Sequence, residues 1–262
     1  MNERFPIVAL SAPAPLILER GDIAIAAPAG TRGPHLFTGP ASFDLPAGTL
    51  LGEGDCAALV VQSRFAYPGD PMLTGLCLQA LTTVELGAGE NQLTATRPGL
   101  ALAIVILSDK GAAGLREDKC APIIYNAASK ALDICHWQTF IIPDDPTRLR
   151  ALLTDLCLTQ RFDLVLTSGG TGVAPRDTTP ETTALVLDKR LPGYERAMTN
   201  ASLAVTPHGA ISRAMAGTLG QALVINLPGS PKAVAENLSP LLPTITHTLK
   251  KLQGDPEDCA QA

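Results

Sequence analysis

Residues 163–181, with the sequence DLVLTSGGTGVAPRDTTPE, constrain the fold of this chain more than any other stretch. A short apolar run at 164–166 predicts a buried strand, which breaks at once into TSGGTG. The glycines lack Cβ atoms, so the backbone N–H groups of this loop can turn toward an anion. Two threonines and a proline at 178–180 then predict the start of a helix with a hydroxyl cap. A strand, a glycine loop and a helix in this order favour phosphate as a ligand.

The letters of this loop exclude two common phosphate-binding motifs. No Gly-Lys-Ser or Gly-Lys-Thr ends it, so it is not a P-loop, and Pro175 stands where a dinucleotide-binding fingerprint needs its third glycine. The alternative, a plain turn without a ligand, needs only one or two glycines and no Arg-Asp pair. We therefore expect the loop to contact phosphate through Thr167, Ser168, Gly169, Gly170, Thr171, Gly172 and Arg176.

From residue 100 onward, apolar strands alternate with amphipathic helices. The pattern predicts strands at 101–107, 139–142, 164–166 and 222–226. It predicts helices at 122–136, from Pro146 onward, and from Ser230 to about residue 252. This order predicts an α/β fold with a mostly parallel, doubly wound sheet.

Residues 1–98 have a different character. They contain no lysine, and short apolar runs alternate there with turns rich in glycine and proline. This pattern predicts a small β-rich domain, either a barrel or a sandwich. The dipeptide Pro98-Gly99 marks the boundary, so we expect one domain at 1–98 and a second at 99–262.

Polar residues follow the predicted strands of the second domain at the points where they end. They are Ser108 and Asp109, then Asp144, then the glycine loop with Asp177, and finally Pro228, Gly229, Ser230 and Lys232. Because the carboxyl ends of parallel strands share one edge of a sheet, we expect these residues to form one site. Carboxylate oxygens suit a hard cation, so Asp144 and Asp177 are the expected Mg²⁺ ligands.

Each of these residues also has a purely structural interpretation. Asp145 precedes Pro146 and is expected to cap a helix, so the function falls to Asp144. Ser230 would equally be a helix cap, Asp109 would close a turn, and Arg176 would pair with Asp177. The histidines at 136, 208 and 247 have no partners at metal-ligand spacing, and we expect them to be structural.

Composition excludes several classes of partner. A formal net charge of −5 supplies no basic field for nucleic acid. No apolar run is long enough for a membrane span, and Glu3 with three early prolines argues against a signal peptide. The cysteines, at 56, 77, 120, 135, 157 and 259, form no C-x-x-C, which favours thiols in a reducing compartment. We therefore expect a cytoplasmic protein.

The segment SGGTGVAPRDTTPE resembles the signature of molybdenum-cofactor biosynthesis proteins of the MogA/MoaB type, which include the G domain of gephyrin. The resemblance covers residues 101–255 approximately, with SDKGAAG, IPDD, LPGYERAM, SLAVTPHGAISR and NLPGSPKAV as further segments. It implies a molybdopterin adenylyltransferase, which joins the phosphate of molybdopterin to AMP from ATP, releases pyrophosphate and uses Mg²⁺. It also implies a homotrimer and a MoeA-type metal-insertion protein as a partner.

The resemblance assigns roles to individual residues. The two essential carboxylates fall on Asp144 and Asp177, and the serines that contact the pterin fall on Ser202 and Ser212. One departure is the sequence KCA at 119–121, where the family pattern usually has a Ser-Gly pair. In the first domain, residues 43–62 are similar to part of a MOSC domain, but the cysteine expected after them is absent.

Two other functions remain open at this point. The chain could hold the pterin without adenylating it, as a MoaB-like or MOSC-linked binding module. It could also hydrolyse nucleotide pyrophosphates, as the related CinA domain shares the GGTG loop. The complete RDTTPE segment and both aspartates favour the transferase. A MoeA-type metal-inserting domain normally belongs to a much longer chain.

Overall fold

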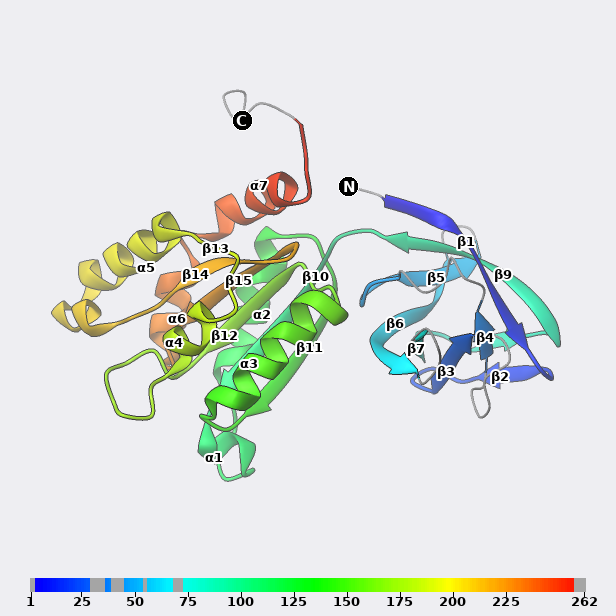
Figure 1. Ribbon diagram of the computed structural model, residues 1–262, viewed down its shortest axis with the longest axis horizontal. Helices are drawn as coiled ribbons and strands as arrows, with labels where there is room; N and C mark the ends of the chain where they lie inside the picture. The colour runs from blue at the N-terminus through cyan, green and yellow to red at the C-terminus, as the bar shows by residue number, and fades with distance from the viewer. Residues whose placement is uncertain (1–2, 29–35, 39–44, 54–55, 68–72, 257–262) are drawn as a thin grey trace. The chain divides into compact units, whose positions relative to one another are not determined.

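The computed structural model describes residues 3–28, 36–38, 45–53, 56–67 and 73–256 (Figure 1). The chain divides into two compact units, Met1–Gly99 and Leu100–Ala262. This division falls one residue from the boundary expected at Pro98-Gly99. In the part of the chain described, no helix is both long and apolar enough to span a bilayer.

The first unit is a closed barrel of seven strands in the order β1-β4-β3-β7-β6-β5-β9. Its interior is filled by leucine side chains such as Leu10, Leu36, Leu59 and Leu76, all fully buried. Strands β2 and β8 form a separate two-stranded antiparallel sheet. The strands are β1 (Glu3–Ala12), β2 (Leu16–Leu18), β3 (Ile23–Pro28), β4 (Leu36–Thr38), β5 (Leu50–Glu53), β6 (Cys56–Tyr67), β7 (Leu73–Ala80), β8 (Val84–Leu86) and β9 (Gly89–Arg97). A barrel is one of the two architectures expected for this part.

The MOSC-like interpretation of this unit stays a prediction. Within the stretch 43–62 that carries it, residues 43, 44, 54 and 55 lie outside the described residues, as does Cys259 at the other end of the chain.

The second unit contains a six-stranded sheet in the order β11-β10-β12-β15-β14-β13. The four strands β11, β10, β12 and β15 run parallel, whereas β14 and β13 are antiparallel. The strands are β10 (Leu100–Leu107), β11 (Ile134–Ile142), β12 (Leu164–Ser168), β13 (Lys189–Arg190), β14 (Ala216–Leu219) and β15 (Ala222–Leu227). The mostly parallel α/β sheet is therefore confirmed, with two short antiparallel strands that the pattern did not predict.

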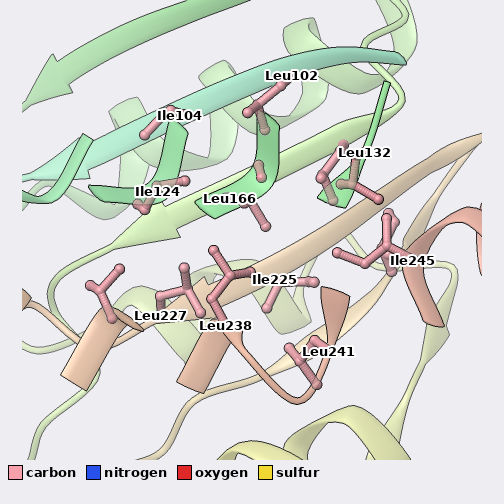
Figure 2. Packing of buried hydrophobic residues seen from close by; sticks show 14 of the residues in the cluster. Leu102, Ile104, Ile124, Leu132, Leu166, Ile225, Leu227, Leu238, Leu241 and Ile245 are labelled. Atoms are coloured by element: carbon pink, nitrogen blue, oxygen red, sulfur yellow. The ribbon is translucent and has the colours of Figure 1, made fainter. Parts of the chain in front are cut away.

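Helices cover both faces of this sheet, as a doubly wound fold requires (Figure 1). One face packs against α2, α6 and α7, where Leu102, Ile104, Leu166 and Ile225 meet helical residues such as Ile124 (Figure 2). The helices are α1 (Asp109–Ala112), α2 (Cys120–Ala131), α3 (Pro146–Thr154), a π-helical turn (Asp155–Thr159), α4 (Thr179–Ala184), α5 (Pro192–Val205), a 3₁₀ turn (Pro207–Ile211), α6 (Pro231–Leu238) and α7 (Leu242–Leu252).

The helix expected at 122–136 is wrong at its C-terminal end. α2 ends at Ala131, Leu132 is already extended, and β11 begins at Ile134. The run ICHWQTFII is rich in β-branched and aromatic residues, which favour a strand beside β10. The buried face of α2 includes Ile124 and Ala128.

Two other helix predictions need correction. The helix expected from Ser230 to about residue 252 is two helices, α6 and α7, interrupted by Pro240 and with Pro243 in the first turn of α7. Thr178 occupies the cap position of α4, but its hydroxyl makes no capping hydrogen bond. By contrast, Asp145 caps α3 as expected, and its carboxylate accepts from the N–H groups of Thr147 and Arg148 at 2.8 and 3.1 Å.

Candidate active site

The parallel strands β10, β12 and β15 end in register at one edge of the sheet. Ile106 pairs with Ser168, which in turn pairs with Leu227. The Ser168 hydroxyl donates to the Pro228 carbonyl at 2.9 Å, and the Gly169 N–H donates to the Leu227 carbonyl at 3.2 Å. The chain leaves β10 for a helix on one face and enters β12 from the other, so this edge is the switch point at which doubly wound sheets bind ligands.

The glycine loop adopts backbone conformations that other residues rarely take. Gly169 has φ +112° and Gly170 has φ +64°, whereas Gly172 does not have a positive φ. A Cβ on Gly169 would collide with the Leu107 carbonyl oxygen, and one on Gly170 would collide with the Thr179 hydroxyl. A Cβ on Gly172 would lie 2.7 Å from Oδ2 of Asp177. The glycines are therefore required by close approach as well as by backbone angle.

Thr179 holds the first half of this loop. Its hydroxyl donates to the Gly169 carbonyl at 3.0 Å and its N–H donates to the Gly170 carbonyl at 3.1 Å. Among the described residues, none accepts a hydrogen bond from the N–H groups of Gly170, Thr171 or Gly172. The loop thus presents three successive donors to a ligand, an arrangement that favours an anion.

Three aspartates border the loop, two of them linked to each other. The Asp109 N–H donates to Oδ2 of Asp144 at 3.4 Å, and the Asp144 N–H donates to Oδ1 of Asp109 at 3.2 Å. Oδ1 of Asp144 lies 3.6 Å from the position of a Cβ on Gly170. Oδ2 of Asp177 accepts from the Ala174 N–H at 2.9 Å. The two carboxylates assigned to the metal therefore lie beside Gly170 and Gly172 of the same short loop.

Arg176 pairs with Asp109 and not with Asp177. Its Nη2 lies 2.9 Å from Oδ2 of Asp109 and also donates to the Asp144 carbonyl at 3.4 Å. Both side chains of the pair are largely exposed, so the pair contributes little to stability. Asp109 was expected to belong to the same site, and a carboxylate bonded to Arg176 is suited to orienting that cation.

Burial raises the pKa of the Asp144 carboxyl, and the nearby carboxylates of Asp109 and Asp177 raise it further. The hydrogen bond from the Asp109 N–H and the charge of Arg176 act in the opposite direction. The net direction is upward, and burial is its largest cause. A cation bound beside Asp144 would favour the charged carboxylate.

The described residues hold no group of three or more His, Cys, Asp and Glu side chains placed to bind a metal ion. The aspartate pair is therefore a partial ligand set. Mg²⁺ commonly takes one or two carboxylates together with substrate phosphates and water, so the pair fits this cation only with a phosphate bound beside it.

Arg213 is a residue of this site that the sequence analysis did not find. Its Nε donates to the Gly172 carbonyl at 2.7 Å, its Nη2 donates to the Asp177 carbonyl at 2.5 Å, and its Nη1 pairs with Glu181. Its own N–H donates to the Thr171 carbonyl at 3.0 Å. It stands 41 residues from Gly172 in the chain, so no local spacing could have linked the two.

A cavity of about 320 Å³ opens at the ends of β10 and β12. It is lined by the predicted residues Ser108, Ser168 and Gly229, and by a segment that had no predicted role, Arg116 to Cys120. The Cys120 thiol donates to the Gly229 carbonyl at 3.5 Å, and burial raises the pKa of this thiol. The cavity is of the size and lining expected for part of a small-molecule site.

Comparison with known proteins agrees with this geometry. The family described as a probable molybdopterin binding domain matches residues 103–247. The chain belongs to this molybdopterin-binding family. A molybdopterin adenylyltransferase of Haemophilus influenzae is 38% identical over 140 residues, covering 53% of this chain and 71% of that protein. Gephyrin of Dictyostelium discoideum is 35% identical over 163 residues, but the match spans only 23% of gephyrin.

Solved structures give the same relation. The molybdopterin biosynthesis enzyme MoaB of Thermus thermophilus is 37% identical and superimposes with a TM-score of 0.55, covering 61% of this chain and 99% of MoaB. The matched part of the present chain is its α/β unit, so the MogA/MoaB-like fold expected for that unit is confirmed.

The remaining residues that the family resemblance singled out are dispersed. Ser202 is buried and accepts a hydrogen bond from Asn237 at 2.8 Å, and no described contact joins it to the glycine loop. Ser212 precedes Arg213, and its hydroxyl oxygen is buried without a partner among the described residues. Lys232 is 80% exposed and lies 3.8 Å from Glu236. Their roles toward a pterin or a phosphate stay predictions.

Several predicted residues have structural contacts in addition to any ligand role. Ser108 caps α1 by accepting from the Gly111 N–H at 3.1 Å, and Ser230 caps α6 by accepting from the Ala233 N–H at 3.3 Å. The Thr167 hydroxyl is buried and accepts from the Asn226 amide at 3.0 Å. The departure from the family pattern at 119–121 lies at the start of α2, where the Asp118 carboxylate accepts from two N–H groups, so this end of the helix is capped without the Ser-Gly pair.

Proposed function

We propose that this chain acts in molybdenum cofactor biosynthesis as a molybdopterin adenylyltransferase. The observation that carries the proposal is the glycine loop, whose free N–H groups stand between Asp144 and Asp177. Relatives that match 53–59% of the chain at 34–38% identity are named molybdopterin adenylyltransferase, which supports the same activity.

The reaction is an in-line displacement at the α-phosphorus of ATP. A phosphate oxygen of molybdopterin attacks, a new phosphoanhydride bond forms, and the bond to the bridging oxygen breaks as pyrophosphate departs with the electron pair. Such a transfer needs alignment and neutralisation of charge more than it needs a covalent enzyme intermediate. The loop N–H groups would hold phosphate oxygens in position, with Arg176, oriented by Asp109, as a further cation.

Asp144 and Asp177 would hold Mg²⁺ through carboxylate oxygens. The placement of the carboxylates supports this assignment, because Asp109 and Asp177 both lie near Asp144 and, among the described residues, only the Arg176 guanidinium opposes them there. When bound, the ion supplies neutralisation of the phosphate charge that builds up on the leaving pyrophosphate. The carboxylates also hold the backbone around the site: that of Asp144 accepts from the Asp109 N–H after β10, and that of Asp177 accepts from the Ala174 N–H.

Further parts of the proposal rest on the family resemblance. We infer that Ser202 and Ser212 contact the pterin, that Lys232 with the turn Pro228 to Ser230 holds phosphate, and that the active form is a cytoplasmic homotrimer. A MoeA-type metal-insertion protein would take the adenylylated product. The first unit, which resembles part of a MOSC domain at residues 43–62, would be separable from this chemistry.

The test is to incubate the full chain with ATP, Mg²⁺ and molybdopterin and to detect the products by mass. The proposal requires a pterin heavier by one adenylyl group, together with pyrophosphate. A pterin that binds but stays unmodified would identify a binding module, and AMP formed without the pterin would identify a nucleotide pyrophosphate hydrolase.

A further inference from the structure

The carbonyl groups of Gly169, Gly170, Thr171 and Gly172 all accept hydrogen bonds, and the donors belong to two residues. Thr179 donates to those of Gly169 and Gly170. The Arg213 backbone N–H donates to that of Thr171, and the Arg213 guanidinium group donates to that of Gly172. In a planar trans peptide the C=O and the following N–H point in opposite directions. Each held carbonyl therefore turns the next N–H away from Thr179 or Arg213. The Arg213 backbone thus orients the Gly172 N–H, and its guanidinium group fixes the peptide that follows Gly172.

The same guanidinium group reaches beyond the loop. Its Nη2 donates to the Asp177 carbonyl, which fixes the backbone of a proposed metal ligand. Its Nη1 pairs with Glu181 in α4, which orients the planar guanidinium group and balances its charge. Because that charge is already paired and the donors point at carbonyl groups, Arg213 is arranged to shape the loop and not to bind the phosphate itself.

We propose that Arg213 is a positioning residue of the active site, whose guanidinium group holds Gly172 and Asp177 so that the end of the loop and the Asp177 carboxylate face the substrate. The kinetic part of this proposal rests on the proposed transferase function. A planar fork with donors in fixed directions serves three acceptors at once, which a lysine ammonium on a flexible stem does not reproduce.

Two variants and one control test this inference. Arg213→Gln removes the charge and most of the fork, and Arg213→Lys keeps the charge without the fork. Arg190→Gln is the matched control, because Arg190 makes an equally direct pair with Glu195, at 2.7 and 2.9 Å, but does not contact the loop in the described part of the chain. The measurements are hydrogen–deuterium exchange over residues 169–182 and the steady-state kinetics of adenylyl transfer.

We expect faster exchange at the loop amides of Arg213→Gln, and a fall of about 100-fold in kcat that exceeds any rise in KM, because small displacements of aligned groups have effects of this size. Arg213→Lys should recover only a small part of the lost kcat. Arg190→Gln should match the wild type in both measurements.

Three results would overturn the inference: unchanged loop exchange in Arg213→Gln, a loss confined to KM, or full recovery by lysine. If Arg213→Gln does not fold, Arg213→Lys decides the matter, since it keeps the charge beside Glu181. If the wild type transfers no adenylyl group, the proposed function fails, and the exchange data still decide whether Arg213 holds the loop.

Discussion

Replacing Gly170 with alanine perturbs the loop in two separable ways. At φ +64° an L-residue crowds its own backbone, which costs about 1–2 kcal/mol. The new Cβ also collides with the Thr179 hydroxyl, so the hydrogen bond from Thr179 to the Gly169 carbonyl cannot keep its 3.0 Å geometry. Thr179 is almost fully buried, and leaving its partner unsatisfied costs about 1–3 kcal/mol more.

The expected destabilisation of Gly170→Ala is therefore about 2–5 kcal/mol. For a unit of this size the melting temperature should fall on the order of 10 °C. Gly254→Ala is the matched control, because Gly254 has φ +90° but nothing within 4 Å of the added Cβ. It should show only the backbone strain.

The assay is thermal unfolding of both variants together with titration of molybdopterin. We expect Gly170→Ala to lose more stability than Gly254→Ala and to lose most of its pterin affinity, with Gly170→Val affected more strongly because valine is β-branched. If Gly170→Ala unfolds at the temperature of the control and binds the pterin as the wild type does, the loop is only a turn, and our interpretation of its N–H groups is wrong.

Other predictions concern the carboxylates and the boundary between units. Asp144→Ala and Asp177→Ala should abolish adenylyl transfer with the fold retained. Asp145→Ala should instead cost about 1 kcal/mol of stability, because it removes a helix cap. If Asp145→Ala lowers activity more than Asp144→Ala does, the wrong carboxylate was chosen. Because the pKa of Asp144 is raised, the folded protein keeps this proton at a pH at which the unfolded chain has lost it. The stability of the wild type relative to Asp144→Asn should therefore fall as pH rises from about 4 through the raised pKa. Added Mg²⁺ should restore that stability above this window in the wild type only, and identical pH profiles of unfolding would contradict the assignment. Residues 99–262 expressed alone should fold and bind the pterin, and an insoluble or inactive fragment would show that the barrel contributes to the site.

The sequence predicted the parts of this molecule that depend on local pattern. Each parallel strand was found because it is an apolar run that ends in polar or glycine residues, and the cap at Asp145 follows from the proline after it. The end of α2 was missed because Ile134 continues a helical spacing by coincidence, while pairing with β10 makes it the start of a strand.

The parts that depend on distant contacts could not be predicted. Arg213 contacts Gly172 and Asp177 across the fold, and the pairing of Arg176 with Asp109 joins two loops 67 residues apart. The pattern could suggest only the neighbour, Asp177, as the partner of Arg176. Helix α6 and helix α7 were merged because their apolar residues keep one phase across Pro240.

The most direct test of the central claim follows the α-phosphorus of ATP. The full chain is mixed with molybdopterin, Mg²⁺ and ATP labelled at the α-phosphate, and the label is traced through the products. Our account predicts that the label appears in the pterin, that pyrophosphate forms in equal amount, and that Asp177→Ala shows neither. Label found only in free AMP, or left entirely in ATP while the pterin stays bound, would contradict it.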